Sequence, residues 1–437
     1  MKKILALALA LTLAVSSLAA CGAASSSSTA PAASTASSEA EKTNEPVTIQ
    51  VSFWDATTTE RMDRLIEGFK KVAPWITIDL VDIPSADYTT KLSVMLNGGS
   101  DVDAFFIKDA DTTPALAAKG QLEDLSEYIK RDNIDLSIYN GVAENFQMDG
   151  KTVALPASSS YYILYYNKDI FDKNNIEYPT NDMTWTEFEE LAGKVTSGTG
   201  ENKDYGALFH TWQACAENWA VVDGKTTILS DDLSAFKTYY DMAICMQDAG
   251  TCMDYATLKT GNLHYSSMFM QGHVAMMPMG GWFCSTMLNK KAAGETDVNW
   301  GIATLPHPEG VEAGYTVGGV TPIAVNAKSE KKDAAWEFAK FVASEEGAKL
   351  QASVGEFPAY LNADTLESIA NLEGMPEGAL DALQVKNIVL DRPLDEKSAE
   401  VNQMLGEQHS LIMLKEVTVD EGVAEMEKLS KEIRGVA

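Results

Sequence analysis

Hydrophobic periodicity divides the beginning of the chain into short strands and helices. Residues 47–53 alternate apolar and polar side chains, which is typical of a half-buried strand. Residues 62–72 carry apolar side chains at helical spacing and are soon followed by a proline, which predicts a helix that ends there. Residues 76–80 alternate again, "YTTKLSVMLNGG" predicts a helix stopped by glycines, and "VDAFFI" predicts a third strand. This βαβαβ order predicts a mostly parallel sheet.

Polar side chains follow the first and third of these strands. Trp54, Asp55 and Thr57 come directly after the first strand, and Asp109 follows the third. In open parallel sheets, ligands bind beyond the carboxyl ends of the strands, so these residues are candidate ligand contacts. An aspartate at such a position can accept two hydrogen bonds from neighbouring hydroxyl groups of a diol. The alternative for both aspartates is a solvated loop position.

A tyrosine-rich segment, "PASSSYYILYYNKDIF", covers residues 156–171. Residues 161–166 are all aromatic or aliphatic, so the pattern predicts a strand that is buried on both faces. The alternative is that the serines and the first tyrosines line a binding site. Both interpretations stay open for this segment on its own pattern.

The second half of the chain repeats the α/β pattern. Thr184 and Glu187 fit a capping box at the start of a helix with one apolar face. We expect Trp185, at the start of that helix, and Trp219, further along, to pack in the core. Further strands are expected at "YGALF", "VAMMPM", "WGIATLP" and "TPIAVN", and "DAAWEFAKFVAS" predicts a helix.

The first residues have the pattern of an export signal, which we expect to span residues 1–20. A basic start is followed by an apolar run that is too short for a membrane-spanning helix with flanks. The run ends in "LAAC", and "GAASSSSTAPAASTASS" follows, which resembles the bacterial lipoprotein box. The resemblance implies that Cys21 becomes the acylated N-terminus, whereas the alternative is a chance cysteine beside an ordinary cleavage site. Residues 22–46 lack large apolar side chains, so residues 21–46 are expected to form a lipidated, flexible tether.

The chain is strongly acidic, with 34 basic and 63 acidic residues. Removal of the export signal takes away Lys2 and Lys3, which leaves 32 basic residues and a formal charge of 32 − 63 = −31. Such a surface repels phosphate backbones and anionic headgroups, so we expect no nucleic-acid partner and expect membrane attachment to come from the lipid. The chain is 45% hydrophobic. The roughly 390 residues after the tether can therefore build two cores.

Three longer stretches resemble a known family. They are "DGKTVALPASSSYYILYYNKDIFDKNNIEYPTNDMTWTEF", "FMQGHVAMMPMGGWF" and "GGVTPIAVNAKSEKKDAAWEFAKFV". In this order they are similar to extracellular solute-binding protein family 1, the sugar-capturing subunits of bacterial ABC importers, and the chain is in this respect similar to maltose-binding protein. The resemblance runs along nearly the whole mature chain. It implies a two-lobed α/β fold like that of periplasmic binding proteins, with a ligand cleft between the lobes and three hinge crossings.

The resemblance also implies where the lobes begin and end. It places the crossings near residues 158–162, near residues 319–322 and around residues 375–385. The first lobe is then expected to comprise residues 47–160 and 323–378, and the second lobe residues 161–322 and 379–437. Hydroxyl side chains at the first crossing could bond sugar hydroxyls without blocking closure of the cleft. Related sugar binders often carry a carboxylate where this chain has Ser160, so the sugar itself is not implied.

The family pattern adds further residues to the candidate site. In "GGWF" it implies that Trp282 stacks on a sugar ring, while the glycines before it let the backbone approach the ligand. The alternative is that Trp282 packs in the core. Trp212, in "FHTWQACAENW", is a weaker second platform for a sugar ring. The full set of candidate ligand contacts is Trp54, Asp55, Thr57, Asp109, Ser159, Ser160, Tyr161, Trp212, Gly281, Trp282, Gly319 and Glu356.

The remaining motifs do not favour a catalytic or metal site. The sequence contains no G-x-S-x-G elbow and no G-x-x-x-x-G-K-[ST] phosphate loop, and its histidines lack an H-E-x-x-H pattern. We therefore expect no enzyme activity, no cofactor and no metal. Four cysteines fall in the expected second lobe, and the sequence leaves open whether they form disulfides. They are Cys215, Cys245, Cys252 and Cys284.

The sequence and the resemblance together favour one function. We expect an extracytoplasmic, lipid-anchored monomer that captures a carbohydrate by hinge closure and delivers it to the permease subunits of an ABC transporter. One alternative is the same fold binding a non-sugar solute, such as a polyamine or a polyol phosphate. The other is a lipid-anchored glycoside hydrolase, which needs two carboxyl groups about 5–9.5 Å apart across a sugar.

Overall fold

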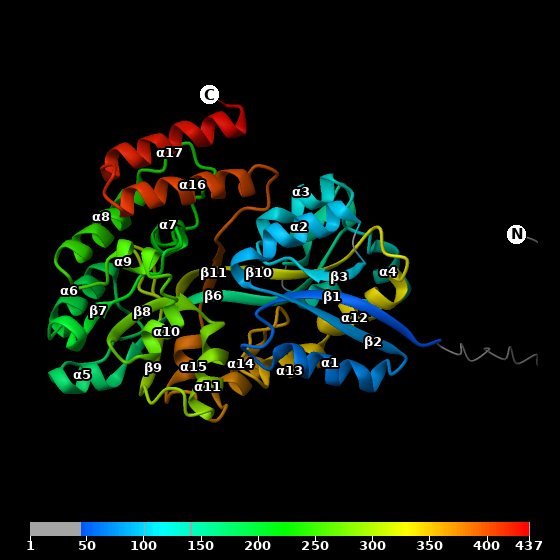
Figure 1. Cartoon of the computed structure of the whole chain (residues 1–437), viewed down its shortest axis with the longest axis horizontal. Helices are drawn as coiled ribbons and strands as arrows, with labels where there is room; N and C mark the ends of the chain where they lie inside the picture. Colours follow the sequence, from blue (N-terminus) through cyan, green and yellow to red (C-terminus); the bar gives the residue numbers. More distant parts are fainter. Residues whose placement is uncertain (1–44, 100, 140–141, 437) are drawn as a thin grey trace, which may run out of the picture. The chain divides into compact units, whose positions relative to one another are not determined.

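The first three strands form the parallel sheet that the periodicity predicts. β1 (Val47–Trp54) pairs in parallel with β2 (Ile76–Ile83) on one side and with β3 (Val102–Phe106) on the other. The two connections are the predicted helices, α1 (Arg61–Val72) and α2 (Tyr88–Gly98). The carboxyl ends of β1 and β3 therefore meet at one edge of this sheet (Figure 1).

The computed structural model describes residues 45–99, 101–139 and 142–436. Contacts along the chain group Glu45–Ala437 as one compact unit, and the following description concerns this unit alone. The predicted export signal, Cys21 and nearly all of the predicted tether lie outside the described residues. None of the described helices is long and apolar enough to cross a membrane.

Two long strands connect this first sheet to the rest of the fold. β6 (Leu155–Asn167) pairs through its first half with β10 (Tyr315–Val325), and through its second half with β8 (Val274–Gly280) and β9 (Trp300–Thr304), all antiparallel. β10 also pairs with β3, so the described residues build a nine-stranded mixed sheet in the order β2-β1-β3-β10-β6-β8-β7, to which β9 and β11 are attached. The short strands of the chain are β4 (Gln147–Met148), β5 (Lys151–Thr152), β7 (Tyr205–Ala207) and β11 (Asn387–Leu390).

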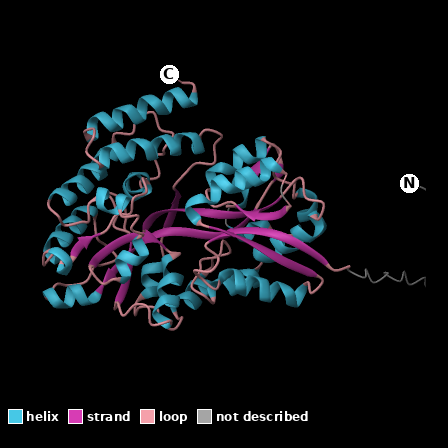
Figure 2. Ribbon diagram, viewed as in Figure 1, coloured by secondary structure: helices cyan, strands magenta, loops and turns pink. Residues whose placement is uncertain are grey.

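Helices cover both faces of this sheet, as Figure 2 shows. The helices of the middle of the chain are α3 (Thr113–Ala118), α4 (Ser126–Arg131), α5 (Lys168–Asn174), α6 (Trp185–Val195), α7 (Ala214–Val221), α8 (Ala235–Asp248), α9 (Tyr255–Thr260), α10 (Tyr265–Met270) and α11 (Phe283–Ala292). The later helices are α12 (Lys332–Val342), α13 (Glu345–Ala352), α14 (Ala363–Ala370), α15 (Ala379–Leu383), α16 (Ser398–Met413) and α17 (Val419–Arg434). The predicted strands in the second half correspond to β7, β8, β9 and the end of β10, and the predicted helix corresponds to α12.

The tyrosine-rich strand β6 is buried on both faces, as its sequence predicts. Tyr162, Leu164 and Tyr166 belong to one hydrophobic cluster, together with α6, α7, α8 and α17. The alternate residues, from Tyr161 to Tyr165, belong to a second cluster with α10, α11 and α15. The aromatic side chains of this segment therefore fill the cores on the two sides of one strand.

The hydrophobic clusters define two lobes. Lobe 1 comprises β1–β3, α1–α4, α12 and α13, whose apolar side chains pack on the two faces of the first sheet. Lobe 2 comprises β7–β9, α5–α11 and α14–α17, packed on the two faces of the second half of β6. β6 and β10 run through both lobes. The α/β fold predicted from the order of elements is confirmed.

Two predictions about lobe 2 are also confirmed. Thr184 and Glu187 form the capping box at the start of α6, each side chain bonding the backbone N–H of the other. Trp185 and Trp219 are buried and lie against one another in the core, with ring centroids 4.9 Å apart. Neither tryptophan is therefore free to stack on a ligand.

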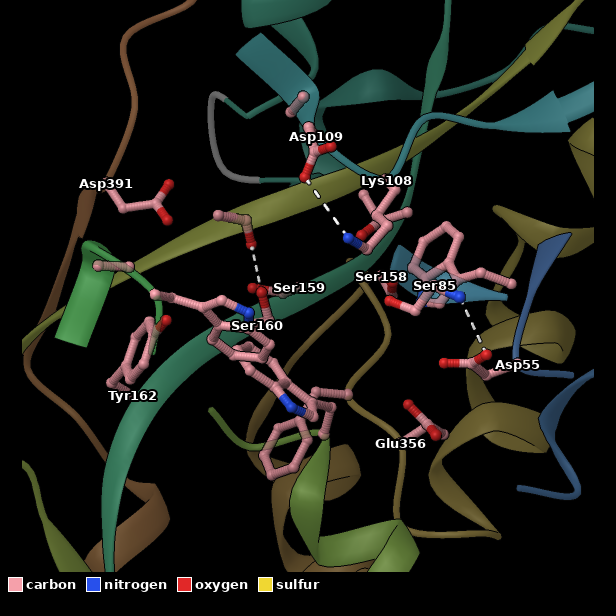
Figure 3. Close-up of a pocket in the computed structure, with 18 of the residues that line it drawn as sticks. Asp55, Ser85, Lys108, Asp109, Ser158, Ser159, Ser160, Tyr162, Glu356 and Asp391 are labelled. Atoms are coloured by element: carbon pink, nitrogen blue, oxygen red, sulfur yellow. Dashed lines mark hydrogen bonds and ion pairs between the residues drawn. The ribbon is translucent and has the colours of Figure 1, made fainter. Parts of the chain in front are cut away.

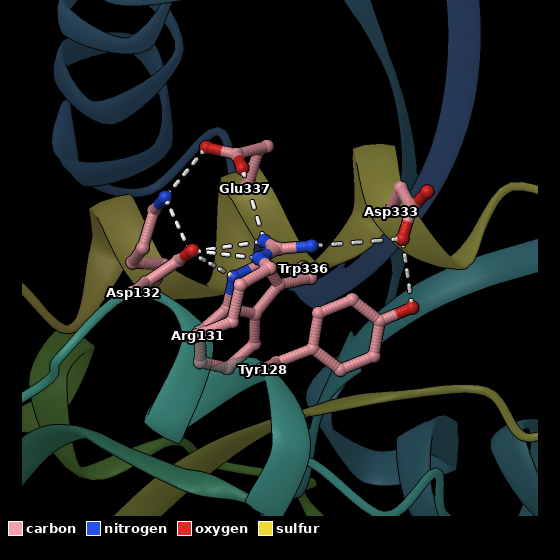
Figure 4. Close-up of polar contacts among 7 residues, drawn as sticks. Tyr128, Arg131, Asp132, Asp333, Trp336 and Glu337 are labelled. Atoms are coloured by element: carbon pink, nitrogen blue, oxygen red, sulfur yellow. Dashed lines mark hydrogen bonds and ion pairs between the residues drawn. The ribbon is translucent and has the colours of Figure 1, made fainter.

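A polar network on lobe 1 joins α4 to α12 (Figure 4). The Asp132 carboxylate, just after α4, accepts hydrogen bonds from Arg131 (2.7 and 3.0 Å), the Trp336 indole (2.7 Å) and Lys340 (2.8 Å). The hydrogen bonds from Arg131 hold the pKa of Asp132 well below its usual range. Partial burial opposes this shift, and the hydrogen bonds from Lys340 and Trp336 add to it. Ionised Asp132 therefore fastens the end of one helix to the side of the other.

We expect Asp132→Asn to lower the free energy of unfolding by about 1–3 kcal/mol at pH 7, the range for hydrogen bonds to a charged group. A carboxylate with a lowered folded pKa contributes its full stability above the unfolded value of about 3.9, and loses it as the pH falls through the folded pKa. Urea denaturation should thus show a constant difference from pH 7 to pH 5 that shrinks below pH 4. Asp101→Asn, at an exposed position, is the control and should change little. An equal loss at every pH would contradict this account.

Candidate functional site

A cavity of about 510 Å³ lies between the two lobes, where the carboxyl ends of β1 and β3 face lobe 2. This volume is within the range of about 300–1,000 Å³ that is usual for small-molecule sites. Its walls come from the ends of β1 and β3, the middle of β6 and β10, the beginnings of α7, α10 and α11, and the segment after β11. Figure 3 shows side chains from these segments converging on one space.

The end of β1 supplies an aromatic side chain and a carboxylate to the cavity. Trp54 is held in place by stacking on Phe53, with ring centroids 4.5 Å apart, and by an edge contact with Tyr88. Asp55 adopts a left-handed backbone conformation (φ 46°) that turns the chain out of the strand. Its Oδ1 accepts a hydrogen bond from the Ser85 backbone N–H at 3.0 Å, which leaves Oδ2 available to a ligand.

A buried arginine and a buried glutamate lie together at this part of the cavity. Arg61, the first residue of α1, is only 4% exposed and lies over the rings of Phe53 and Phe106 at 5.0 and 5.3 Å. Its Nε and Nη2 have no hydrogen-bond partner among the described residues. Glu356 is 8% exposed; burial raises its pKa, and the charge of Arg61 opposes the rise. Unpaired buried donors of this kind favour binding of a ligand with oxygen acceptors.

Lobe 2 contributes an aromatic wall. Trp212 is 36% exposed and Trp282 is half-buried, with ring centroids 6.4 Å apart and planes tilted by 54°. The Trp282 Nε1 donates a hydrogen bond to the Tyr265 hydroxyl at 2.9 Å, and the Trp282 ring meets the edge of Tyr162 at 5.6 Å. His264 lines the same wall, and burial lowers its pKa, so the neutral imidazole is favoured. This wall offers flat apolar faces that are oriented by hydrogen bonds and edge contacts.

The serines of β6 lie between the two lobes. Ser158, Ser159 and Ser160 all line the cavity, and the hydroxyl of Ser160 donates a hydrogen bond to the Gly319 carbonyl at 3.4 Å. The backbone N–H of Ser159 donates to the Phe357 carbonyl at 2.9 Å, so the segment around Phe357 lies beside β6. Short hydroxyl side chains at this position leave room for a ligand.

The remaining end of the cavity is charged. Lys108, Asp109 and Asp111 follow β3, and Asp391 and Arg392 follow β11 on the other side of the cavity. The Asp391 backbone N–H donates to the Gly318 carbonyl at 2.9 Å, which fixes this segment beside β10. Figure 3 shows the side chains of Asp109 and Asp391 turned toward the same part of the cavity.

Arg392 extends from this end of the cavity into the core of lobe 2. Its Nε donates to Asn402 at 2.7 Å, its Nη1 to Asn218 at 2.7 Å, and its Nη2 lies 3.5 Å from Glu217. Burial raises the pKa of Glu217 to about 7, while Arg392 and a hydrogen bond from Tyr240 oppose the rise. The ion pair and the hydrogen bond to Asn218 hold the segment after β11 against α7, and the hydrogen bond to Asn402 holds it against α16.

The structure brings together nine of the twelve predicted contacts. The residues that line the cavity are Trp54, Asp55, Asp109, Ser159, Ser160, Trp212, Trp282, Gly319 and Glu356. Thr57, Tyr161 and Gly281 do not line it. Thr57 is exposed on the surface, Tyr161 points into the core with its hydroxyl donating to the Leu383 carbonyl at 2.8 Å, and Gly281 packs against the Phe357 ring.

Several cavity residues were not among the sequence candidates. The pattern of α1 indicates only a helix beginning near Arg61, and nothing in the sequence marks that side chain as buried. Asp111 lies two residues after Asp109, so the strand-end argument could have included it. Asp391 and Arg392 follow a short strand with no distinctive pattern, and only the fold brings them to the cavity. Tyr265 and His264, at the start of α10, carry no local signal either.

The four cysteines of lobe 2 are all free, which answers the question that the sequence left open. Cys215, Cys252 and Cys284 are buried and Cys245 is exposed. Burial raises the pKa of Cys215, Cys252 and Cys284 to about 12, so these thiols behave as small apolar side chains. The described residues hold no group of three His, Cys, Asp or Glu side chains that could bind a metal ion.

Comparison with known proteins places this architecture in a family. Residues 55–349, more than half of the chain, match the family model described as bacterial extracellular solute-binding protein. A solved sugar transporter from Rhizobium etli in an open conformation is 41% identical, with a TM-score of 0.75 over 88% of this chain and 99% of that chain. An ABC substrate-binding protein from Listeria monocytogenes in complex with cycloalternan is 24% identical, with a TM-score of 0.77 over 90% of this chain and all of the other.

A more distant relative is a periplasmic protein of Agrobacterium fabrum named for binding sn-glycerol-3-phosphate. It is 24% identical over 237 residues, which cover 51% of this chain and 52% of that protein. The two-lobed fold, the cavity between the lobes and the extent of the family match lead to one conclusion. The chain belongs to the bacterial extracellular solute-binding protein family.

Proposed function

We propose that this protein captures a carbohydrate in the cavity between its lobes and delivers it to the permease subunits of an ABC importer. The observation that carries the proposal is the pairing of two partly exposed indoles, Trp212 and Trp282, with the carboxylates of Asp55 and Glu356 in one cavity. Indole faces stack on the C–H side of a sugar ring, and carboxylates accept hydrogen bonds from its hydroxyl groups. The 41% identity to a protein named as a sugar transporter supports the same solute class.

The proposed mechanism is closure of the two lobes about the strands that connect them. β6 and β10 pair with each other where they pass between the lobes, with Gly319 opposite Ser160, and small changes in their twist can open the cavity. We place the third crossing at residues 352–361 rather than at 375–385, because Phe357 and Ile369 pack in the core of lobe 2. Lobe 1 then extends over residues 47–160 and 323–351, and lobe 2 over residues 161–322 and 362–437.

A phosphate-bearing solute is less well supported than a neutral sugar. Three of the four cationic side chains that line the cavity have a carboxylate within 4 Å, which reduces their attraction for a phosphate. Lys108 lies 3.9 Å from Asp109, Lys290 lies 2.7 Å from Glu295, Arg392 lies 3.5 Å from Glu217, and Arg61 feels the charge of Glu356.

We further propose that the bound sugar is not cleaved. Hydrolysis requires one carboxyl group to act as an acid and a second to act as a nucleophile or base across the glycosidic bond. The membership in a binding-protein family supports capture without chemistry. Incubation of the protein with mixed oligosaccharides, followed by chromatography, tests this point, and any product that depends on Glu356 or Asp55 would contradict it.

The experiment that tests the proposed function is a thermal-shift screen of mono- and oligosaccharides with the protein lacking residues 1–21. A ligand that binds only the folded state raises the apparent melting temperature by mass action. We expect at least one carbohydrate to give a saturable shift, and calorimetry to confirm a single site. Phosphorylated polyols and polyamines belong in the same screen. A shift with one of these and with no carbohydrate would overturn the carbohydrate assignment.

We propose that the protein is exported, cleaved before Cys21 and anchored to the outer face of the membrane by lipid on that cysteine, as a monomer. The sequence "LAAC" and the polar segment that follows it support this proposal. In cells, Cys21→Ala is expected to move most of the protein from the membrane fraction to the soluble fraction or the medium, because the tether has a single basic residue, Lys42, and no large apolar side chains, and so gives little other membrane affinity. A mutant that stayed in the membrane fraction would contradict the lipid anchor.

A further inference from the structure

The charged end of the cavity holds more carboxylates than cations. Asp109, Asp111 and Asp391 line it together with Lys108 and Arg392. Lys108 lies 3.9 Å from Asp109, which forms one pair of opposite charges. Asp391 lies directly over β10, where a Cβ added to Gly319 would meet its Oδ1 at 3.2 Å. The net charge at this end of the cavity therefore depends on whether the Arg392 guanidinium points into the cavity or away from it.

The guanidinium of Arg392 is hydrogen-bonded to the wall behind the cavity and not to the cavity carboxylates. All three of its nitrogens have partners in lobe 2 or on the backbone, namely Asn402, Asn218, the Asp391 carbonyl and Glu217. Glu217 is fully buried, so its charge needs Arg392 as a partner. Asp111 and Asp391 are thus left without a cation of their own.

Asp111 is the carboxylate at this end that most clearly lacks a hydrogen-bond donor. Its side chain lines the cavity, yet the residue is only 4% exposed, and its Oδ2 has no hydrogen-bond partner among the described residues. Burial, then the charge of Asp109, raises the pKa of Asp111 to about 6, with Arg392 opposing the rise and Asp391 adding to it. A buried acceptor that faces a cavity and lacks a donor marks a place where a ligand group binds.

We propose that this acidic end of the cavity binds a protonated amine, so that the solute is an amino sugar; the inference rests on the proposed carbohydrate function. An ammonium group has three N–H donors and a positive charge. It can donate to Asp111 and also offset the charges of Asp109 and Asp391. A neutral hydroxyl supplies a donor but leaves the excess charge in place. A metal ion fits less well, since the part of the chain that the structure describes has no cluster of three metal-binding side chains.

The test compares three disaccharides that share one sugar skeleton. The β-1,4-linked glucosamine disaccharide carries amines, its N-acetylated form carries neutral amides, and cellobiose carries hydroxyl groups at the same positions. We expect calorimetry at pH 7 to show that the glucosamine disaccharide binds about tenfold to a hundredfold more tightly than cellobiose, the range for a charge-assisted hydrogen bond. Spermidine is the fourth probe, because a polyamine carries the same ammonium group without a sugar.

Two variants at opposite ends of the cavity separate the amine subsite from general loss of a carboxylate. Asp111→Asn keeps the size of the side chain and removes its charge, and should bring the glucosamine-to-cellobiose ratio close to one. Asp55→Asn is the matched control at the other end, and should weaken both sugars while leaving the ratio unchanged. The apo melting temperature of Asp111→Asn at pH 7.5 should be no lower than that of the unmodified protein, because a buried, unpaired charge is removed.

The amine subsite also has a pH signature. The carboxylate that receives the ammonium must be ionised, so below the pKa of Asp111 each lost pH unit weakens amine binding by up to about tenfold. The charged groups that act on Asp111 are Asp109 after β3 and Asp391 and Arg392 after β11, and Lys108 lies beside Asp109. From pH 6 to pH 5 the affinity for the glucosamine disaccharide should fall more steeply than that for cellobiose, because Glu356, whose pKa burial also raises, contributes to the binding of both sugars. In Asp111→Asn the two sugars should show the same pH dependence.

Each result of these experiments decides for or against the inference. Preferential binding of the glucosamine disaccharide that is lost in Asp111→Asn supports it. If cellobiose or the N-acetylated form binds as tightly as the glucosamine disaccharide or more tightly, the amine subsite is overturned and the carbohydrate function stays intact. The same conclusion follows if none of the three disaccharides binds but another neutral sugar does. Binding of spermidine with no sugar binding at all overturns the carbohydrate function itself.

Discussion

Replacing Trp282 with alanine is expected to weaken carbohydrate binding by roughly tenfold to a hundredfold. The indole lines the cavity, and the hydrogen bond from its Nε1 to the Tyr265 hydroxyl orients it. If its face stacks on a sugar ring, alanine removes about 1–3 kcal/mol of aromatic burial from the complex. Calorimetric titration with the carbohydrate that gives the largest thermal shift measures the effect.

The same substitution also tests how much Trp282 contributes to folding. The ring packs against both hydrophobic clusters of lobe 2, but it is half-buried, so the apo protein should lose less than the about 3–5 kcal/mol typical of a fully buried tryptophan. Trp300→Phe is the control, because Trp300 is buried in β9 and does not line the cavity. That variant should lose stability and keep its affinity. Strong destabilisation of Trp282→Ala with affinity intact in the folded fraction would rule out the stacking role.

The local elements of the fold follow from sequence because each depends on neighbouring residues. The alternation at residues 47–53 and the helical spacing at residues 62–72 correspond to β1 and α1. The tyrosines of β6 are a further case, since a run without a polar face requires a core on both sides. The pairing of β6 with β10, which are about 160 residues apart, is a long-range contact that no local pattern contains.

The candidate site was predictable only in part, because local sequence patterns do not contain long-range contacts. Asp55 and Asp109 follow strands whose direction the sequence reveals, so their place at the edge of the sheet could be deduced. Tyr161 lies next to Tyr162 in the same segment, but only Tyr162 faces the cavity, because successive side chains of a strand point to opposite faces. Arg61 and Asp391 reach the cavity through packing between distant segments, for which their own neighbours give no signal.

Arg392→Met is expected to destabilise the apo protein by about 3–5 kcal/mol. The side chain keeps its apolar stem but loses the guanidinium that faces fully buried Glu217. Removing one partner of a buried ion pair leaves an uncompensated charge, which costs more than the pair itself contributed. Urea denaturation at pH 7 measures the change in the free energy of unfolding. A loss below about 1 kcal/mol would show that Glu217 does not depend on Arg392.

The pH dependence of the Arg392→Met variant tests whether the charge of Glu217 causes the loss of stability. The folded pKa of Glu217, already about 7, should rise further without Arg392, whereas its unfolded value stays near 4.3. A carboxyl group whose folded pKa is raised lowers stability as the pH rises from the unfolded value toward the folded one. The variant should therefore lose more stability at pH 8 than at pH 6. Adding Glu217→Gln should flatten this slope and recover most of the loss, since Tyr240 can still bond the neutral amide. A double variant as unstable as Arg392→Met alone would instead attribute the loss to the bonds from Arg392 to Asn218 and Asn402.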